Sequence, residues 1–467
     1  MLYRLLRSIA GIALRWYYSR IDAKGLERLP AGAPMLLAVN HPNALIDALV
    51  VTWVFPRRVV LTAKATLFSN PIRGAFFRAA GVVPLIRMQD VSAAKSAQDA
   101  RRNERAFDAL RSALNTGRAV LIFPEGVTGD HTSLAPLRTG AARLALQARA
   151  SGVRGLAIVP VGLTFERKDV PRTRVFAQVG EPIDLDSWAL RDDAAGIAAL
   201  TSEIERRLRA VTLNFETADD AARVTGLASL FARIFRGTET VPPVWVPHEP
   251  LAGQFTISKR VEDARTALKD ASDQLRERVD VLLGNLSRFE ETLAGLDLSI
   301  EDVEIALDVS SGRRFAVREL PIVLLAGPFA AWGWLNHLLP FNLARAIGRR
   351  SMASAADPAM RTIVSGVALV LGFYALQGAV VYWLLGGWVA VLYLLSLPVA
   401  ADVNFSFRAR LSRATGRARA YFLFRRRPQI QAKLADELRW LRAEARALGS
   451  ILNDADGLRA AGQASRG

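Results

Sequence analysis

Two long stretches of this sequence carry no charged side chain, and they constrain the fold more than any other feature. Residues 320–344 form the first stretch and residues 362–401 the second, which Gly386 and Gly387 divide. At about 1.5 Å per residue of helix, the part before the two glycines reaches about 36 Å, more than the roughly 30 Å hydrocarbon thickness of a bilayer. We therefore expect hydrophobic membrane hairpins over residues 319–407. A buried helix pair in a soluble core is the alternative.

Arginine side chains lie at all three flanks of these stretches. They are Arg313, Arg314 and Arg318 before the first, Arg345, Arg349, Arg350 and Arg361 between the two, and Arg408, Arg410, Arg413, Arg417, Arg419, Arg425, Arg426 and Arg427 after the second. Because cytoplasmic flanks are enriched in Lys and Arg, a single cytoplasmic side satisfies all three flanks. This arrangement predicts a hairpin that turns at Gly386-Gly387 and a shorter re-entrant bend of residues 320–344 at Pro328.

Charge and cysteine content narrow the classes of function. The formal net charge is +17 and the chain has no cysteine. A basic excess of this size is typical of proteins that bind nucleic acid, an anionic membrane surface or phosphorylated substrates. Because the sequence has no zinc-finger spacing, RNP motif or basic region with heptads, we expect no nucleic acid partner. The lack of cysteine excludes disulfides, thiolate metal sites and a cysteine acyl-enzyme.

The first 20 residues have the pattern of a basic amphipathic helix. On a helical wheel, one side collects Leu2, Leu5, Leu6, Ile9, Ile12, Ala13, Trp16 and Tyr17. The other side collects Arg4, Arg7, Ser8, Gly11 and Arg15. Such a helix is suited to a membrane interface. We therefore expect residues 1–20 to be an amphipathic membrane-interface helix, with packing on the following domain as the alternative.

Residues 21–215 alternate between short apolar runs and helical patterns. The runs predicted as strands are 35–39, 58–64, 81–87, 119–126, 155–165 and 174–183, with helices at 92–114 and 140–150. This alternation is typical of an α/β fold with a mostly parallel, buried sheet flanked by helices. Beyond it we expect a helical region at 216–318, with a Pro-rich linker near 240–250, and a basic C-terminal helical region at 408–467.

The segment NHPNALID places His41 and Asp47 just after the first predicted strand. Histidine is the usual general base, and a carboxylate on its second ring nitrogen stabilises the imidazolium. At this spacing a regular helix would turn the two side chains to different faces, so they meet only if His41 lies in the loop before a helix. Pro42 favours that loop, because proline prefers the first helical turn and disfavours helix for the residue before it. An incidental loop histidine is the alternative.

Further candidate residues follow other predicted strands, at the sheet edge where α/β folds bind ligands. They are Lys64 in LTAKATLF, Arg87 in GVVPLIR, Glu125 and Gly126 in FPEG, and Pro160 in IVPVGL. An arginine there can bind a phosphate through its planar fork, and a glycine allows close approach of the backbone to a ligand. A surface arginine, a turn-capping glutamate and an incidental lysine are the alternatives. The remaining histidines show no ligand spacing, so we expect no metal site.

As an ordered set, the segments NHPNALID, GVVPLIR, FPEG and IVPVGL resemble the four blocks of the glycerolipid acyltransferase family, the glycerol-3-phosphate and 1-acylglycerol-3-phosphate acyltransferases. The resemblance covers about residues 30–215, so it implies an acyltransferase domain at 21–215. It implies that His41 is the general base and Asp47 its orienting partner.

The same resemblance implies roles for residues of the later blocks. Arg87, Glu125 and Gly126 would bind the acceptor, and Pro160 would lie on the side of the acyl donor. Lys64 is a further candidate for substrate binding. After FPEG the sequence reads VTGD, where the family pattern has a serine or an arginine close by, so the contacts to a phosphate stay open at this point.

The spacing in the first block also departs from the common pattern. Five residues separate His41 from Asp47, from Pro42 to Ile46, where the common pattern has four. The longer spacing resembles the branch that includes fungal glycerol-3-phosphate/dihydroxyacetone-phosphate acyltransferases. This favours glycerol-3-phosphate as the acceptor over lysophosphatidate.

Taken together, the resemblance implies a membrane-associated O-acyltransferase of phospholipid biosynthesis. A fatty acyl group would pass from acyl-CoA or acyl carrier protein (acyl-ACP), used as co-substrate with no other cofactor, to a hydroxyl of glycerol-3-phosphate or lysophosphatidate. The partners would be membrane lipids, a glycerophosphate or lysophospholipid acceptor and the acyl donor, at the cytoplasmic face of the cell (inner) membrane. The alternatives are a lysophospholipid-remodelling acyltransferase, and a non-catalytic lipid-binding or scaffold protein on a degenerate acyltransferase domain.

Overall fold

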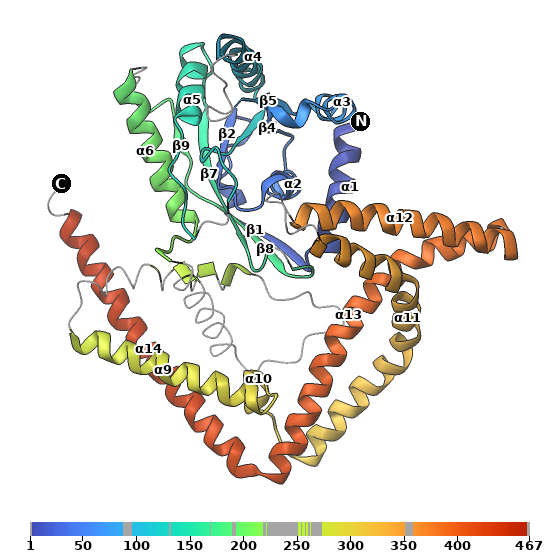
Figure 1. Ribbon diagram of the computed structural model, residues 1–467. Helices are drawn as coiled ribbons and strands as arrows, with labels where there is room; N and C mark the ends of the chain where they lie inside the picture. The colour runs from blue at the N-terminus through green and yellow to red at the C-terminus, as the bar shows by residue number, and fades with distance from the viewer. Residues whose placement is uncertain are drawn as a thin grey trace. The chain divides into compact units, whose positions relative to one another are not determined.

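In the computed structural model, four of the predicted runs and the first part of the run 58–64 pair into a seven-stranded sheet (Figure 1). The segment Arg20–Lys24, which was not predicted as a strand, adds one edge. Its strands are β1 (Arg20–Lys24), β2 (Met35–Val39), β3 (Val59–Val60), β6 (Ala119–Ile122), β7 (Ala157–Phe165), β8 (Arg174–Val179) and β9 (Ile183–Asp184). The order is β1-β8-β7-β2-β6-β3, and β9 pairs with β7. Every pair is parallel except β7 with β8 and β7 with β9. The predicted α/β fold with a mostly parallel sheet is confirmed.

The structure describes residues 2–86, 96–129, 132–168, 170–188, 193–217, 273–350 and 358–464, with a few residues between 221 and 262. The chain divides into two compact units. The first holds Met1–Ala222, Pro247–Thr256 and Gly348–Val364, and the second holds Arg223–Val246, Ile257–Ile347 and Ser365–Gly467. The predicted Pro-rich linker at 240–250 lies outside the described residues.

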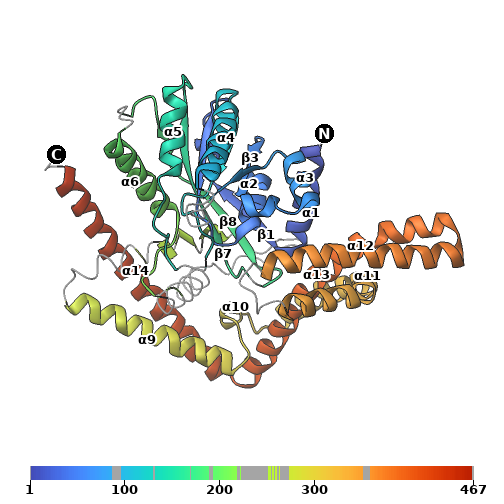
Figure 2. The same cartoon turned by 45° about the horizontal axis from the view of Figure 1, so that its top comes forward.

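Helices cover both faces of the sheet, which explains the unbroken apolar runs. All residues of β2 and of β6 are buried, as expected for strands packed on both sides. On one face, Leu36 and Ala38 share a core with three helices, α4 (Ser96–Asn115), α5 (Gly140–Ala150) and α6 (Ala194–Val211). The opposite face is covered by α2 (Ala44–Val54), with α1 (Leu2–Tyr17) packed beside it (Figures 1 and 2).

The predicted strand at 58–64 divides at Leu61 into two strands of different sheets. β3 belongs to the main sheet, whereas β4 (Thr62–Lys64) pairs in parallel with β5 (Val83–Leu85). The short helices η2 (Ala65–Phe68) and α3 (Pro71–Ala79) follow β4 and were not predicted.

Helix α1 packs on α2 through the side of its wheel that carries Gly11. A Cβ atom at Gly11 would lie 2.1 Å from the Trp53 ring, so only glycine allows this approach. The Arg7 guanidinium donates hydrogen bonds to the carbonyls of Trp53 and Phe55, at 3.1 and 2.9 Å, where α2 ends. This packing leaves three apolar side chains of the opposite side exposed, Leu5, Ile9 and Ile12. The membrane-interface role of α1 stays a prediction.

Among the described residues, three helices are long and apolar enough to cross a membrane. They are α11 (Val309–Arg350), α12 (Pro358–Leu385) and α13 (Gly387–Arg426). The boundaries that we predicted at 318/319 and 407/408 fall inside α11 and α13, because a helix continues where its side chains change from apolar to charged. The charged half of α13 then packs with α9 (Asp273–Gly295), α10 (Ile300–Val303) and α14 (Pro428–Ala464) around a core of leucine and phenylalanine.

The chain turns at Gly386-Gly387 as predicted, and the place of this hairpin in a membrane stays a prediction. Helix α12 ends before Gly386, whose φ of 87° is in the region that favours glycine, and α13 begins after it. The arms meet closely, since a Cβ atom at Gly378 would lie 3.0 Å from Cδ1 of Leu394. Figure 1 shows the two arms side by side.

The predicted turn at Pro328 is wrong, because α11 runs through Pro328 as one helix. Residues on both sides of this proline meet the same partner helix: Gly327 lies near Phe407, and Gly333 lies against Ala400, both on α13. A proline in a helix removes one hydrogen bond and can bend the helix without ending it. Helix α11 changes direction further along (Figure 1), where it contacts α12 through His337 and still contacts α13 through Phe341.

Polar side chains join the three helices. Glu319 of α11 accepts two hydrogen bonds from the Arg410 guanidinium of α13, at 2.7 and 2.9 Å. His337, which is 1% exposed, has Nε2 2.7 Å from the Tyr374 hydroxyl of α12 and Nδ1 2.7 Å from the Gly333 carbonyl. Hydrogen bonds of this kind join helices where apolar contact alone gives little preference for one partner.

The contact between α11 and α13 leads to a testable expectation. A Cβ atom at Gly333 would lie 2.0 Å from the Ala400 carbonyl oxygen. We expect Gly333→Ala to force the helices apart and to lower the free energy of unfolding by about 1–3 kcal/mol. The measurement is the thermal unfolding midpoint of the detergent-solubilised protein. Gly372→Ala on α12 is the matched control, because no atom lies within 4 Å of its Cβ position; an equal loss in both variants would contradict the packing.

Candidate active site

Two neighbouring strands end at the same edge of the sheet and bring the first and third sequence blocks together. β2 and β6 are parallel, with Ala38 opposite Ile122. The chain leaves β2 toward His41 and leaves β6 toward Glu125. The backbone N–H of His41 donates to Oε1 of Glu125 at 2.7 Å, and the backbone N–H of Ala135 donates to Oε2 at 3.0 Å.

Glu125 therefore holds two loops together. Its side chain is 5% exposed, and a carboxylate removed from water is stabilised only when hydrogen bonds replace the lost solvation. Each of its oxygens accepts a backbone amide. In this structure the carboxylate fixes the site, and the predicted contact with the acceptor stays a prediction.

His41 and Asp47 meet as predicted. His41 Nδ1 and Asp47 Oδ2 are 2.9 Å apart, and the Asn43 backbone N–H donates to the same oxygen at 2.7 Å. His41 precedes α2, whereas Asp47 lies in its first turn, where the helix dipole favours a negative charge. Their exposed fractions are 8% and 0%, so the pair is shielded from bulk water.

This geometry fixes the chemistry that His41 can perform. An ionised carboxylate only accepts hydrogen bonds, so beside it Nδ1 carries the proton and Nε2 is the ring nitrogen that can accept one. The imidazole is also held by Phe123 of FPEG, whose ring stacks on it with centroids 3.7 Å apart and planes at 12°. The arrangement is that of a general base with an orienting partner.

The loop between the two residues contains a backbone conformation that is unusual for alanine. Ala44 has a φ of 45°, in the left-handed region that favours glycine. The residue before it, Asn43, has φ −140° and ψ 40°. We interpret Ala44 as the position where the loop takes up the additional residue of its longer spacing, so that His41 and Asp47 still meet.

Three side chains that sequence reasoning missed support this loop. The Asn40 side chain forms two hydrogen bonds with the backbone of Leu163 in β7. Its Oδ1 accepts from the Leu163 N–H at 2.6 Å, and its Nδ2 donates to the Leu163 carbonyl at 3.1 Å. Lys168 donates to the Pro42 carbonyl at 3.2 Å. The Tyr18 hydroxyl accepts from Nδ2 of Asn43 at 3.1 Å. Burial raises the pKa of Tyr18 well above its ordinary value, so the phenol keeps its proton.

The other predicted residues lie at different depths. Lys64 ends β4 opposite Leu85 of β5, and it is half-buried. Gly126 has a φ of 70°, which the turn after Glu125 requires. Pro160 is buried in β7, opposite Ala38 of β2, at the place where the antiparallel partner changes from β9 to β8.

Proline cannot donate a backbone hydrogen bond, and the change of partner strand at Pro160 is a position that suits such a residue. The predicted place of Pro160 beside the acyl donor stays a prediction. Arg87 lies outside the described residues, so its predicted contact with the acceptor also stays a prediction. The structure does place the residue before it: both backbone groups of Ile86 are hydrogen-bonded to the Asn103 side chain, at 2.8 and 2.7 Å.

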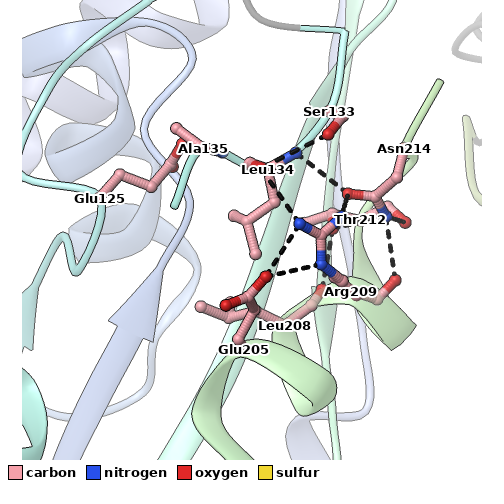
Figure 3. A network of polar contacts seen from close by, with 9 residues as sticks. All are labelled: Glu125, Ser133, Leu134, Ala135, Glu205, Leu208, Arg209, Thr212 and Asn214. Atoms are coloured by element: carbon pink, nitrogen blue, oxygen red, sulfur yellow. Dashed lines mark hydrogen bonds and ion pairs between the residues drawn. The ribbon is translucent and has the colours of Figure 1, made fainter. Parts of the chain in front are cut away.

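The loop after FPEG is held by the end of α6 and the residues that follow it. The Asn214 Oδ1 accepts the Leu134 backbone N–H at 3.0 Å, and Arg209 donates to the Leu134 carbonyl at 3.4 Å (Figure 3). Glu205 in turn holds the Arg209 guanidinium at 2.9 Å. The loop is thus fixed between Glu125 on one side and α6 on the other.

Comparison with known proteins agrees with this geometry. Residues 20–164 match the family model described as Acyltransferase. The chain is 38% identical over 85 residues to "Glycerol-3-phosphate O-acyltransferase 2" of Saccharomyces cerevisiae, covering 18% of this chain and 11% of the yeast protein. It is 27% identical over 192 residues to "1-acyl-sn-glycerol-3-phosphate acyltransferase" of Limnanthes alba, covering 39% and 61% of the two chains.

The comparisons also include a bacterial relative and a solved structure. The "1-acyl-sn-glycerol-3-phosphate acyltransferase" of Haemophilus influenzae is 26% identical over 216 residues, covering 43% of this chain and 82% of the relative. The crystal structure of the 1-acyl-sn-glycerophosphate (LPA) acyltransferase from Thermotoga maritima has a TM-score of 0.33 and 18% identity, over 44% of this chain and 77% of that chain.

The first unit therefore carries an acyltransferase domain. By its blocks and its relatives, this domain is similar to the glycerolipid acyltransferases. The chain spans less than two thirds of the length of the yeast and Limnanthes relatives, 11% and 61%.

The strained alanine gives a test of the loop. A β-branched side chain tolerates a positive φ poorly, whereas glycine adopts it freely. We expect Ala44→Val to lower turnover and the unfolding midpoint together. Ala44→Gly should keep wild-type turnover, because glycine adopts the same backbone conformation. The fold should stay as stable, since relief of about 1–2 kcal/mol of backbone strain offsets the roughly 0.4–1 kcal/mol that a more flexible unfolded chain costs. Equal turnover in both variants would show that the loop needs no left-handed residue.

Proposed function

We propose that this protein is a membrane-associated O-acyltransferase that moves a fatty acyl group from acyl-CoA or acyl-ACP to a hydroxyl of a glycerophosphate acceptor. The observation that supports this most is the buried pair of His41 and Asp47, 2.9 Å apart at the end of β2. Its location beside FPEG in an acyltransferase domain supports the same reaction class.

In the proposed mechanism, Nε2 of His41 takes the proton of the acceptor hydroxyl as its oxygen attacks the thioester carbonyl. Asp47 holds Nδ1–H and stabilises the imidazolium that forms. When the carbon–sulfur bond breaks, the imidazolium returns its proton to the leaving thiolate. Developing negative charge on the carbonyl oxygen needs hydrogen-bond donors nearby, and backbone amides serve this purpose in acyl transfer.

Glycerol-3-phosphate is the acceptor that we propose first, and lysophosphatidate second. The support is the five-residue spacing between His41 and Asp47 and the likeness of part of the chain to the yeast glycerol-3-phosphate acyltransferase. Arg87, with Lys64 and the backbone at Gly126, would bind the acceptor, and β7 around Pro160 would lie toward the acyl donor. A remodelling acyltransferase, which uses another lysophospholipid, is the alternative within the same chemistry.

The dyad yields the central prediction. His41→Ala should lower turnover by at least about 100-fold, because the general base is lost. Asp47→Asn should also lower it, since an amide no longer stabilises the imidazolium. The measurement is acyl transfer by the purified full chain to labelled glycerol-3-phosphate and to lysophosphatidate, with each donor in turn.

The matched control for this assay is a change of an acidic residue away from the dyad, Glu203→Gln on α6. Glu203 pairs only with Arg206 and Arg207 of its own helix among the contacts of the described chain. Near-normal turnover of His41→Ala would show that His41 is not the general base. No turnover of the wild type would favour the non-catalytic scaffold protein, whereas transfer to lysophospholipids alone would favour the remodelling enzyme.

For the membrane unit we propose that all three arginine flanks lie on the cytoplasmic side of the cell (inner) membrane, together with the catalytic unit. Glu319, at the start of the first uncharged stretch, pairs with Arg410 at the open end of the hairpin. Ala344, at the end of that stretch, lies 3.7 Å from the Cβ position of Gly366, also at the open end. Both ends of the stretch therefore meet the hairpin near its open end.

Single cysteines test this topology, because the native chain has none. Ser311→Cys, Ser351→Cys and Ser412→Cys should all resist a membrane-impermeant thiol reagent in intact cells and react after lysis. Reaction of Ser351→Cys from outside would place the middle flank on the far side and overturn the topology, without affecting the catalytic assignment.

A further inference from the structure

Arg138 lies against the FPEG turn, although it comes from further along the chain. The sequence directly after Gly126 has no arginine, but the loop returns to this turn twelve residues later. The Arg138 backbone N–H donates to the Pro124 carbonyl at 2.7 Å. Its Cγ lies 3.2 Å from the Cβ position of Gly126. The stem of the side chain thus crosses the turn whose Glu125 holds His41.

The charge of Arg138 is not used by the fold. The residue is exposed, and within the described part of the chain its guanidinium has no hydrogen-bond or ion-pair partner. Nearby arginines differ: Arg209 is held by Glu205, and Arg149 donates to the carbonyls of Trp188 and Asp186. An unpaired guanidinium on the turn whose Glu125 holds His41 is available to an anionic substrate.

The loop that presents Arg138 is fixed on both sides. Ala135 is held by Glu125, and Leu134 is held by Asn214 and Arg209 (Figure 3). Asn214 and Arg209 lie beyond residues 20–164, which match the family. A fixed loop loses little conformational entropy when a ligand binds. The free energy of a contact between its side chain and the ligand is therefore less reduced by the cost of ordering the loop.

We propose that Arg138 binds the phosphate of the acceptor and supplies the cation that the segment VTGD lacks. This inference rests on the proposed function, since it names a residue for the acceptor side of the same site. A guanidinium binds two phosphate oxygens through its planar fork, and hydrogen bonds to charged groups are about twice as strong as neutral ones.

The test uses the purified full chain in detergent micelles with the acyl donor that the wild type uses. Arg138→Ala should raise the KM for glycerol-3-phosphate by about 10- to 100-fold and leave kcat within about 2-fold. Arg138→Lys should recover part of the loss, because it restores the charge but not the fork. Arg143→Ala is the matched control: it removes an exposed arginine of α5 and should leave KM unchanged.

Two acceptors and a direct binding measurement separate the outcomes. Lysophosphatidate carries the same phosphate, so Arg138→Ala should raise its KM as well. Calorimetric titration with glycerol-3-phosphate should show weaker binding to Arg138→Ala than to Arg143→Ala, independently of turnover. If the wild type is active and Arg138→Ala has the KM and the affinity of the wild type, this inference is overturned and the proposed function stands. If the wild type neither binds nor acylates either acceptor, both are overturned.

Discussion

The parallel pairing of β2 with β6 is the constraint on which the catalytic unit depends. Neighbouring parallel strands release their chains at one edge, so the loops at His41 and Glu125 meet without any further device. The apolar residues of both strands are buried on both faces, and a slip of one residue would exchange those faces. The same core that stabilises the sheet therefore also sets the register of the dyad with the FPEG turn.

Sequence reasoning reached the parts of the site that are local in the chain. The short distance from His41 to Asp47, and a proline between them, were enough to predict the loop, the helix and the hydrogen bond. The contributions of Tyr18 and Asn214 were not predictable, because each comes from a distant segment and carries no pattern of its own. Arg138 was missed for the same reason: only the folded loop brings it to Gly126.

For the three helices that could cross a membrane, composition predicted their length and the turn at Gly386. It did not predict the path of α11 along its neighbouring helices. A proline was taken as a break, yet the helix continues and gains contacts with α12 beyond Gly333 while it still contacts α13. Packing decides this course: a glycine that admits the Ala400 backbone and a histidine that meets Tyr374 join particular helices. Neither feature is visible in hydropathy, because apolar side chains meet lipid and neighbouring helices about equally well.

The left-handed residue at Ala44 bears on how relatives of this protein are found. One unusual φ angle lets a loop of five residues reach the geometry that the common pattern reaches with four. A search that demands a fixed interval between the histidine and the aspartate would pass over this chain although its two side chains meet at 2.9 Å. A search should instead allow one additional residue in this interval and require alanine, glycine or asparagine three places after the histidine. Such a search describes the loop by its backbone conformation and not by its length.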